Sequence, residues 1–366
     1  MENRLSQDLD HVLNHTGDIW ADMRGERIFV TGGTGFVGSW LLESLLWANR
    51  RMSLGIRCSV LTRNPAAFVA RLPHLACDEA VTLCAGDAAD FEFPDGSFPF
   101  IVHAASGRYS DPKPESPVGS FDGDVAATRA VLEFARTRGA RRFLFTSSGA
   151  VYGKQPPQMK HIPEDYPGAV LASDVSAAYG HAKRTSEFLC SCYAHAYRFD
   201  TMIARLFAFS GPYLPLDGQF AIGNFIGDGL AGGPLRILGD GTPCRSYLYG
   251  ADLAIWLWTI LFRGKSASPY NVGSPHAVSI ADLARTVRDV VAAGMEIQVA
   301  RRAEVGVAPL RYVPSVLHAE TELGLTVRIP LEEGIRRMWD WNRDGRRRGV
   351  AAEYEESTFA DKAGVL

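Results

Sequence analysis

A tyrosine and a lysine four residues apart, Tyr179 and Lys183, are the pair in this sequence best suited to acid–base chemistry. Residues at this spacing lie one turn apart on the same face of a helix. A free tyrosine has a pKa of about 10. A neighbouring ammonium group stabilises the phenolate and lowers that pKa, so the phenol can act as an acid and a base near neutral pH. The same spacing also fits a surface helix that carries one aromatic residue and one cation, and the pair alone does not decide between the two interpretations.

A serine that could share this chemistry, Ser148, ends a predicted strand over residues 143–148. In an open parallel sheet, ligands bind beyond the carboxyl ends of the strands. Ser148 would therefore meet a substrate hydroxyl or carbonyl together with Tyr179, although a turn-capping role would suit the same serine. The helix that carries Tyr179 is predicted over 175–194, because Ser173 can cap it and helix-favouring residues follow.

A glycine-rich loop between a strand and a helix indicates a dinucleotide site. The β-rich run 27–31 leads directly into Gly-Gly-Thr-Gly-Phe-Val-Gly and then into the helical residues 39–46. Gly32 permits the tight turn, Gly35 lets a pyrophosphate approach the backbone, and Gly38 lets the helix pack closely on the strand. The helix N-terminus adds unpaired N–H groups and the positive end of a dipole. We therefore predict a Rossmann-type nucleotide-binding unit.

The end of the next predicted strand, 58–62, bears on the choice of cofactor. A site for NAD usually has an Asp or Glu there for the ribose hydroxyls, whereas this chain has Arg63. A guanidinium can pair with a 2′-phosphate, which favours NADP. An arginine that only stacks on the adenine would suit either cofactor. The cofactor is therefore predicted to be NAD or NADP, with NADP favoured.

Two further predicted strands end near the same place. Strand 81–87 places Asp87 where it could hydrogen-bond the adenine or cap a turn. Strand 100–106 ends in small residues that leave room for a cofactor. His103 lies within the apolar run of that strand, and we interpret it as a hydrogen-bonded core residue rather than a catalyst. Residues 106–120 are rich in Pro, Ser and Gly and predict a loop.

The composition is that of a soluble globular protein. The chain has 366 residues, of which 46% are hydrophobic and 22% charged, and this is ample for a large core. A net charge of -3 gives no electrostatic reason to expect nucleic acid or an anionic membrane. The six cysteines show no metal-binding spacing, so we expect no metal and the reduced thiols of a cytoplasmic protein. No apolar run reaches the length of a membrane span, and residues 251–262 predict a buried helix.

Four motifs follow one another along the chain: Thr-Gly-Gly-Thr-Gly-Phe-Val-Gly, His-Ala-Ala-Ser, Thr-Ser-Ser-Gly-Ala-Val-Tyr-Gly and Tyr-Gly-His-Ala-Lys. In this combination the sequence resembles the extended short-chain dehydrogenase/reductase family, which contains the NAD(P)-dependent sugar-nucleotide epimerases and dehydratases. The resemblance covers about residues 26–335, and the motifs together are highly specific.

The resemblance implies a set of site residues. The catalytic residues would be Ser148, Tyr179 and Lys183. The cofactor would contact the glycine loop, several strand ends and the catalytic helix, through Gly32, Thr34, Gly35, Phe36, Val37, Gly38, Arg63, Asp87, Ala88, Ala104, Ala105, Ser106, Thr146, Tyr179, Lys183 and Leu206. A nucleotide-diphospho-sugar substrate would contact Ser148, Ala208, Asn224 and Arg245. A bidentate guanidinium after a Gly-Asp-Gly turn also suits the diphosphate on chemical grounds.

Several positions depart from the family pattern. The dehydratases carry an acidic pair where this chain has Gly149 and Ala150, and the decarboxylases keep a glutamate in place of Ala150. Neither of these side chains can exchange a proton, so dehydration and decarboxylation are both disfavoured. Ala208 replaces an asparagine that binds the substrate's diphosphate, and Ser246 replaces an aspartate. The substrate is therefore expected to be held differently, or to differ from a standard UDP- or dTDP-sugar.

The strand and helix pattern, together with the resemblance, predicts an α/β fold. A Rossmann-type doubly wound parallel sheet would be followed by a smaller, mixed α/β substrate-binding lobe. The chain is expected to divide into an N-terminal extension, the dinucleotide-binding domain, the lobe and a tail, over residues 1–25, 26–205, 206–342 and 343–366. This division leaves open whether the chain crosses back from the lobe, residues 206–342, to the dinucleotide-binding domain. Relatives commonly dimerise through the helices that match 124–138 and 177–196, so a homodimer is implied.

These inferences predict hydride transfer at C4 of a nucleotide-diphospho-hexose, with Tyr179 as the acid and base. A 4-epimerase would return the hydride to the other face of a keto intermediate, whereas a 4-ketoreductase would reduce an incoming keto sugar with NADPH. The lack of the dehydratase acids at positions 149 and 150 fits both the epimerase and the ketoreductase, and Arg63 favours the ketoreductase. Alternatives are a sugar-nucleotide dehydratase or decarboxylase, a reductase of a non-sugar carbonyl, and a non-catalytic dinucleotide sensor. A sensor would not need the three catalytic residues, and Arg245 argues against a non-sugar carbonyl.

Overall fold

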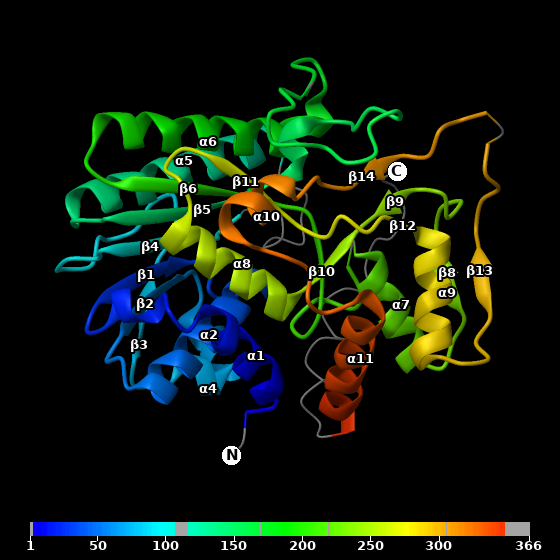
Figure 1. Cartoon of the computed structure of the whole chain (residues 1–366), viewed down its shortest axis with the longest axis horizontal. Coiled ribbons are helices and arrows are strands. Elements are labelled where there is room, and N and C mark those ends of the chain that lie inside the picture. The colour runs from blue at the N-terminus through cyan, green and yellow to red at the C-terminus, as the bar shows by residue number, and fades with distance from the viewer. Residues whose placement is uncertain (1–2, 107–115, 169, 219, 305, 348–366) are drawn as a thin grey trace.

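The computed structural model describes residues 3–106, 116–168, 170–218, 220–304 and 306–347. At its centre lies a seven-stranded parallel sheet with the strand order β11-β6-β5-β4-β1-β2-β3 (Figure 1). Its strands are β1 (Arg27–Thr31), β2 (Arg57–Thr62), β3 (Val81–Ala85), β4 (Phe100–His103), β5 (Arg142–Ser148), β6 (Asp200–Leu206) and β11 (Pro269–Val272). The order β3-β2-β1-β4-β5-β6 is that of the doubly wound Rossmann fold. The predicted fold class is therefore confirmed.

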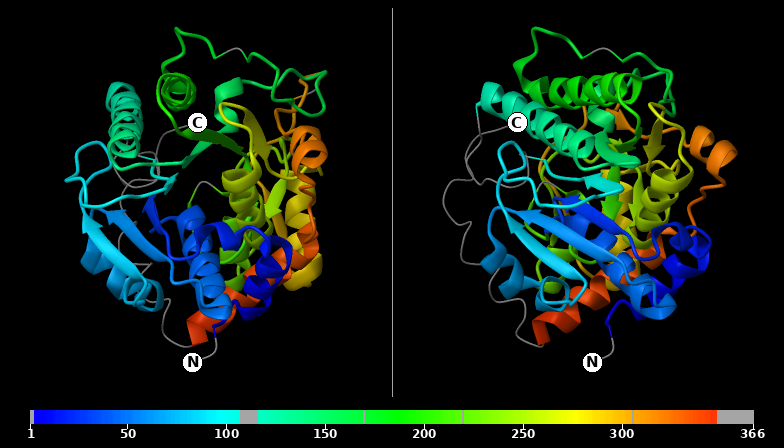
Figure 2. Two further views of the ribbon diagram at one scale, coloured as in Figure 1. Left: turned by 60° about the vertical axis from the view of Figure 1, so that its left-hand side comes forward. Right: turned by 90° about the vertical axis from the view of Figure 1, so that its left-hand side faces the viewer.

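Alternating side chains give each face of this sheet its own hydrophobic core. In β1, Phe29 belongs to one buried cluster, whereas its neighbours Ile28 and Val30 belong to another. This is the consequence of the two-residue period of a strand that is covered on both faces. Helices α5 and α6 cover the Phe29 face, and α2 and α8 cover the other face (Figure 2). The bounds of the four helices are α2 (Phe36–Met52), α5 (Pro117–Thr137), α6 (Ala178–Ala196) and α8 (Gly250–Arg263).

The connection from β4 to α5 differs from the prediction. Strand β4 ends at His103, whereas the predicted strand ran to residue 106. Helix α5 begins at Pro117, where a loop was predicted, and the Ser116 side chain accepts a hydrogen bond of 3.1 Å from Gly119 N. Serine at the N-cap followed by proline at the first helical position is a favourable helix start, which the Pro- and Gly-rich composition hid. Residues 107–115 of the predicted loop lie outside the described residues.

The second half of the chain builds a smaller lobe from short elements. Three small sheets pair β7 with β10, β8 with β13, and β9 with both β12 and β14. Their strands are β7 (Ala208–Ser210), β8 (Leu235–Ile237), β9 (Cys244–Arg245), β10 (Tyr247–Tyr249), β12 (Val278–Ser279), β13 (Ile297–Val299) and β14 (Arg311–Tyr312). A separate buried cluster joins helices α7 (Ala221–Leu230), α9 (Ile280–Val291) and α11 (Leu331–Arg347).

The chain returns twice from this lobe to the Rossmann domain. Helix α8 packs against β5 and β6, and β11 is added to the main sheet beside β6. Helix α10 (Leu317–Leu323) in turn lies against β11 and α8. Residues 206–342 therefore contribute to both the Rossmann domain and the lobe.

The N-terminal segment is a helical layer on the outside of α8 and α2. Helix α1 (Ser6–Thr16) buries Leu9 and Val12, and the short helix η1 (Trp20–Met23) follows it. Asp8 accepts a hydrogen bond of 2.8 Å from the Tyr249 hydroxyl and pairs with Arg337 of α11. Burial raises the pKa of the Asp8 carboxyl, which the two partners counteract. The segment thus joins the Rossmann domain to the last helix of the lobe.

Two predictions drawn from composition can be compared with the structure. Within the described ranges, none of the helices combines the length and the apolar character that crossing a bilayer requires. The six cysteines are free thiols, with Cys190 buried and Cys192 exposed on α6. These two residues of α6 point to different faces of the helix, as their spacing implies.

Candidate active site

Helix α6 holds Tyr179 and Lys183 one turn apart near its N-terminus. The Lys183 ammonium lies 5.8 Å from the centre of the Tyr179 ring and 4.9 Å from the centre of the Phe145 ring. It donates a hydrogen bond of 3.3 Å to the carbonyl oxygen of Thr146. Lys183 is buried and Tyr179 is half-buried. A buried ammonium beside a phenol is the arrangement that the predicted acid–base chemistry of this pair requires.

The N-terminal end of α6 touches the turn that follows Ser148. A Cβ atom on Gly180 would lie 2.7 Å from the carbonyl oxygen of Ala150, so only glycine allows this approach. Ala150 belongs to the short helix η3 (Gly149–Tyr152). Its N–H donates a hydrogen bond of 3.1 Å to Ser148 Oγ. The structure therefore brings Ser148, Tyr179 and Lys183 together at the carboxyl end of β5.

A buried network fixes the end of β5 to α6. Ser147 donates a hydrogen bond of 2.5 Å to Glu187 Oε1, and Arg205 of β6 pairs with Glu187 at 2.7 Å. Successive side chains of a strand point to opposite faces, so this anchor on Ser147 directs Ser148 to the other side. Burial lowers the pKa of Arg205, but the Glu187 carboxylate outweighs this and raises it above its usual range.

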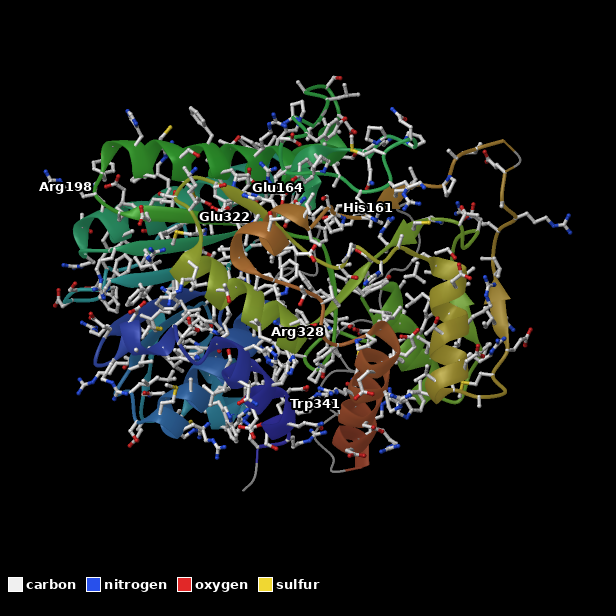
Figure 3. All side chains as sticks on the ribbon, in the orientation of Figure 1. His161, Glu164, Arg198, Glu322, Arg328 and Trp341 are labelled. Carbon is white, nitrogen blue, oxygen red and sulfur yellow. The ribbon has the colours of Figure 1, made fainter. Side chains whose placement is uncertain are left out.

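The same network reaches the edge strand β11. Arg205 donates hydrogen bonds to the Tyr152 hydroxyl at 2.7 Å and to the Glu164 carbonyl oxygen at 3.0 Å. The side chain of Glu164, which is labelled in Figure 3, accepts a hydrogen bond of 2.8 Å from Asn271 N in β11. The Tyr152 hydroxyl donates to Asn271 Oδ1, also at 2.8 Å. None of these residues was predicted as a site residue, although Tyr152 lies in one of the motifs, because their partners are far apart along the chain.

The glycine loop has the close contacts that its predicted roles require. Gly32 has a φ of 71°, and a Cβ there would lie 2.5 Å from the Ala104 carbonyl. A Cβ on Gly38 would lie 2.2 Å from the Gly32 oxygen. Gly35 differs, because its Cβ would meet only the Gly32 oxygen at an ordinary 3.5 Å and would otherwise enter open space. An exposed backbone at the N-terminus of α2 fits the pyrophosphate of a dinucleotide.

Two charged residues flank this loop. Arg63 is exposed directly after β2. Arg71, the last residue of α3 (Pro65–Arg71), donates a hydrogen bond to the carbonyl oxygen of Thr34 in the loop, a contact that the sequence did not predict.

Asp87 accepts a hydrogen bond of 2.9 Å from Ala89 N. Of the two roles predicted for Asp87, the structure thus contains the turn cap.

The other predicted cofactor residues lie at the carboxyl ends of the strands or in the segments that follow them. Ala105 N donates a hydrogen bond of 3.2 Å to Thr31 Oγ1 at the end of β1. Thr146 Oγ1 donates one of 3.2 Å to the His103 carbonyl oxygen. The remaining members belong to the first turn of α2, to the segments after β3 and β4, and to the end of β6, and they are Phe36, Val37, Ala88, Ser106 and Leu206.

His103 is a core residue, as the sequence predicted. Its ring nitrogens lie 2.7 Å from Thr31 Oγ1 and 3.3 Å from Thr128 Oγ1. Burial, together with the nearby charge of Lys183, lowers the pKa of His103 to about 3. The imidazole is therefore neutral at physiological pH and joins β4 to β1 and α5.

On the lobe side, Tyr312 lies between the predicted diphosphate arginine, Arg245, and the predicted catalytic serine, Ser148. Tyr312 pairs with Arg245 in the register of β14 and β9, and the Arg245 guanidinium carbon lies 5.8 Å from the centre of the Tyr312 ring. The Tyr312 hydroxyl lies 3.5 Å from Ser148 Oγ and donates a hydrogen bond of 3.3 Å to the Leu206 carbonyl oxygen. Tyr312 lies in none of the motifs that the sequence analysis used, so only the folded chain identifies it.

The other predicted substrate residues lie on separate elements of the lobe. Ala208 is half-buried in β7 and pairs with Tyr247 of β10. Asn224 is half-buried in α7. Ser246, where the family usually has an aspartate, is completely buried between β9 and β10. Because Ser246 is completely buried, its side chain does not reach a ligand bound at the surface.

Aromatic side chains occupy the space beside Gly149. A Cβ at this position would lie 2.7 Å from the Tyr312 hydroxyl oxygen and 2.8 Å from two ring atoms of Phe207. The Phe207 and Tyr312 rings pack with centroids 4.6 Å apart. The turn after Ser148 therefore presents a neutral aromatic wall where an acidic pair was expected for a dehydratase.

Comparisons with known proteins agree with this architecture. A sequence profile of the NAD dependent epimerase/dehydratase family matches residues 28–273. UDP-glucuronic acid decarboxylase 1 of Xenopus tropicalis is 29% identical over 310 residues, which are 85% of this chain and 70% of that protein. The UDP-glucose 4-epimerase of Thermotoga maritima, solved with UDP-glucose, has a TM-score of 0.73 at 19% identity, over 87% of this chain and 99% of that chain. The UDP-glucuronic acid 4-epimerase of Bacillus cereus, solved with UDP-glucuronic acid and NAD, has a TM-score of 0.70 at 21% identity, again over 87% and 99%.

Proposed function

This chain belongs to the NAD-dependent epimerase/dehydratase family, and on that premise we propose that it transfers a hydride at C4 of a nucleotide-diphospho-hexose. One observation carries the proposal. Ser148, Tyr179 and Lys183 converge at the carboxyl end of β5, on the edge of the sheet where the glycine loop follows β1. A dinucleotide sensor without catalytic activity would not require a buried ammonium beside a phenol at this edge.

The chain's own residues would perform the proton chemistry. When bound, the nicotinamide ring would accept and return the hydride. Tyr179 would remove the proton of the C4 hydroxyl and give it back, and Ser148 would hydrogen-bond the same oxygen. Lys183 would favour the phenolate form of Tyr179. Arg245 would bind the diphosphate through its guanidinium.

The cofactor decides between the two outcomes of this half-reaction. Arg63 favoured NADP and hence a ketoreductase, but the family is described as NAD-dependent and the related 4-epimerase of Bacillus cereus was solved with NAD. We therefore expect NAD as the resident cofactor. With NAD the reaction that conserves the redox state is epimerisation, because the hydride taken from C4 returns to C4.

A second candidate is decarboxylation of UDP-glucuronate, which the Xenopus tropicalis relative favours. Oxidation of a glucuronate at C4 would give a β-keto acid, a class of compound that loses carbon dioxide readily. Gly149 and Ala150 supply no acid or base for that step. We therefore expect epimerisation to exceed carbon dioxide release, and both products are to be measured.

The test compares the wild-type protein with Tyr179→Phe. Bound cofactor is extracted and identified by mass, and UDP-glucose and UDP-glucuronate are then supplied while the C4 epimer and carbon dioxide are quantified. We expect bound NAD⁺, a C4 epimer from at least one sugar, and a loss of about 10²- to 10⁴-fold in turnover for Tyr179→Phe with nucleotide binding intact. Tyr197→Phe, an exposed tyrosine at the end of α6, is the matched control. Equal turnover by wild type and Tyr179→Phe would disprove the proposal.

The assembly and the division of the chain are proposed on the same basis. Pairing of two copies through α5 and α6 is supported by Phe188, which is 68% exposed on α6. We expect Phe188→Glu to shift the protein from dimer to monomer in sedimentation analysis. A functional division into a cofactor domain and a substrate lobe, and a cytoplasmic location, remain predictions from the sequence.

A further inference from the structure

We infer that Asp8, on the N-terminal helix α1, is a positioning residue for the diphosphate of the substrate, because it anchors the strand that follows Arg245. The inference rests on the proposed function, in which Arg245 binds the diphosphate. It adds a residue that lies before the segment 28–273 matched by the family profile. Asp8 would act without touching the substrate, through Tyr249 at the end of β10 and Arg337 of α11.

The first argument is the short path from Asp8 to Arg245. Asp8 Oδ2 accepts a hydrogen bond of 2.8 Å from the Tyr249 hydroxyl. Tyr249 ends β10, and a single residue, Ser246, lies between β10 and the end of β9 at Arg245. Ser246 is completely buried, so protein encloses this connection. A displacement of Tyr249 is therefore transmitted to Arg245 through a short, packed segment of backbone.

The second argument is that Tyr249 lies where the Rossmann domain meets the lobe. Its side chain is buried, and its ring packs edge-on against Trp40 of α2 with centroids 5.7 Å apart. On the lobe side, a Cβ on Gly334 of α11 would lie 3.0 Å from the Tyr249 ring. Burial and the Asp8 carboxylate raise the pKa of Tyr249 well above its usual range, so the phenol keeps its proton and donates it to Asp8. Asp8 thus fixes a ring that both parts of the molecule contact.

The third argument is that α1 also holds the last helix of the lobe. Asp8 pairs with Arg337, which in turn pairs with Glu333 of the same helix at 2.8 Å. The Asp8 side chain is only 7% exposed, and a buried ion pair depends strongly on both partners. Arg4 donates a hydrogen bond of 2.6 Å to the carbonyl oxygen of Trp341, which is labelled in Figure 3. The N-terminal segment therefore anchors two elements of the lobe, β10 and α11.

A second aspartate on α1 provides a matched comparison. Asp10 accepts a hydrogen bond of 2.8 Å from Trp47 Nε1 and lies 3.5 Å from the Arg51 guanidinium. Both partners belong to α2 of the Rossmann domain. Asp8 and Asp10 thus have the same chemistry on the same helix, but the contacts of Asp8 lead to the lobe and those of Asp10 lead to α2.

The experiment measures binding of UDP, which carries the diphosphate without a sugar. Full-length wild type, Asp8→Ala and Tyr249→Phe are titrated calorimetrically with UDP and with NAD⁺, and kcat and KM are measured on the sugar that wild type converts. We expect Kd for UDP and KM to rise about 3- to 10-fold in both variants, because a loosened Arg245 must be ordered on binding. The kcat and the affinity for NAD⁺ should stay within about twofold of wild type, since the catalytic residues lie on β5 and α6.

A double substitution tests whether Asp8 acts through Arg245. Arg245→Met should weaken UDP binding about tenfold, and adding Asp8→Ala to it should weaken binding no further. Asp10→Ala should bind UDP and NAD⁺ as wild type does. If Asp8→Ala does not fold, Tyr249→Phe carries the test, because its ring still packs on Trp40.

The outcomes separate this inference from the proposed function. Multiplicative losses from Asp8→Ala and Arg245→Met would overturn the inference, as would unchanged UDP affinity in Tyr249→Phe. Either result would leave hydride transfer at C4 in place. A wild-type protein that binds no UDP and converts no nucleotide sugar would overturn the proposed function, and this inference with it.

Discussion

The phenol of Tyr312 occupies the space that a side chain at Gly149 would need. A Cβ atom at position 149 would lie 2.7 Å from the Tyr312 hydroxyl oxygen, although the two residues belong to opposite parts of the molecule. The position that lacks an acid after Ser148 thus lies against an aromatic wall formed by Tyr312 and Phe207. The sequence showed the missing acid, and the structure shows what stands in its place.

Replacing Gly149 by alanine should disturb both this wall and Ser148, the predicted catalytic serine. The added methyl group would overlap Tyr312 and Phe207, so we expect a loss of about 1–3 kcal/mol in the free energy of unfolding. We also expect a reduced kcat/KM for the sugar substrate, because Tyr312 must move away from Ser148. Urea unfolding and steady-state kinetics measure the two effects. Gly123→Ala on α5 is the control, since a Cβ there meets nothing within 4 Å; equal stability of the two variants would contradict the predicted overlap.

Substitutions of the last two glycines of the glycine loop, Gly35 and Gly38, should have different effects. Gly38→Ala would place a Cβ 2.2 Å from the Gly32 oxygen, so we expect a destabilisation of about 3 kcal/mol or more. Gly35→Ala meets only an ordinary contact, so the fold should be retained while NAD⁺ binds at least about tenfold more weakly. Thermal unfolding and calorimetric titration with NAD⁺ distinguish the two. Unchanged NAD⁺ affinity in Gly35→Ala would show that the pyrophosphate does not approach this backbone.

The Arg205–Glu187 pair should contribute strongly to stability because it is buried. The side chains are 13% and 10% exposed, and Glu187→Gln would leave the guanidinium without its carboxylate. We expect a loss of about 3–5 kcal/mol in unfolding free energy. Arg205→Met combined with Glu187→Gln should cost less than the sum of the single changes. Asp340→Asn breaks the exposed pair with Arg343 and should cost less than about 1 kcal/mol; a similar cost for both pairs would rule out the role assigned to burial.

His103 should make the protein less stable as the pH falls. Burial lowers its pKa from 6.5 to about 3, so the unfolded chain binds a proton to this residue before the folded chain does. The contribution of the neutral His103 side chain to the unfolding free energy is therefore fully present above pH 6.5, and it is lost as the pH falls from there toward 3. His103→Gln removes this titration, and its unfolding free energy should fall less steeply over that range, by up to about 1.4 kcal/mol per pH unit. The control is His195→Gln, which replaces an exposed histidine. The unfolding free energy of this variant should change with pH as steeply as that of the wild type.

Local patterns in the sequence determined the fold class and the candidate residues of the site. The run from strand to Gly32–Gly38 to helix, the four-residue step from Tyr179 to Lys183, and the strand that ends at Ser148 are each complete within a few residues. Such signals are readable because strand and helix periodicity, and the conformational freedom of glycine, are properties of neighbouring residues. The lack of an acid at Gly149 and Ala150 was visible only through the resemblance to the family, which has acidic residues there.

Only the tertiary structure decided which distant residues complete the site. Tyr312 meets Ser148 across 164 positions of the chain, and Arg205 of β6 reaches Glu187 of α6 and Tyr152 of η3. The start of α5 at Pro117 was missed because a loop-like composition masked the Ser-Pro helix start. The periodicity of hydrophobic residues predicts which side of a helix or strand is buried, but not which other helix or strand covers that side. Contacts of that kind arise when β11 joins the main sheet and β14 pairs with β9 in the lobe, and they depend on packing that no short window of sequence contains.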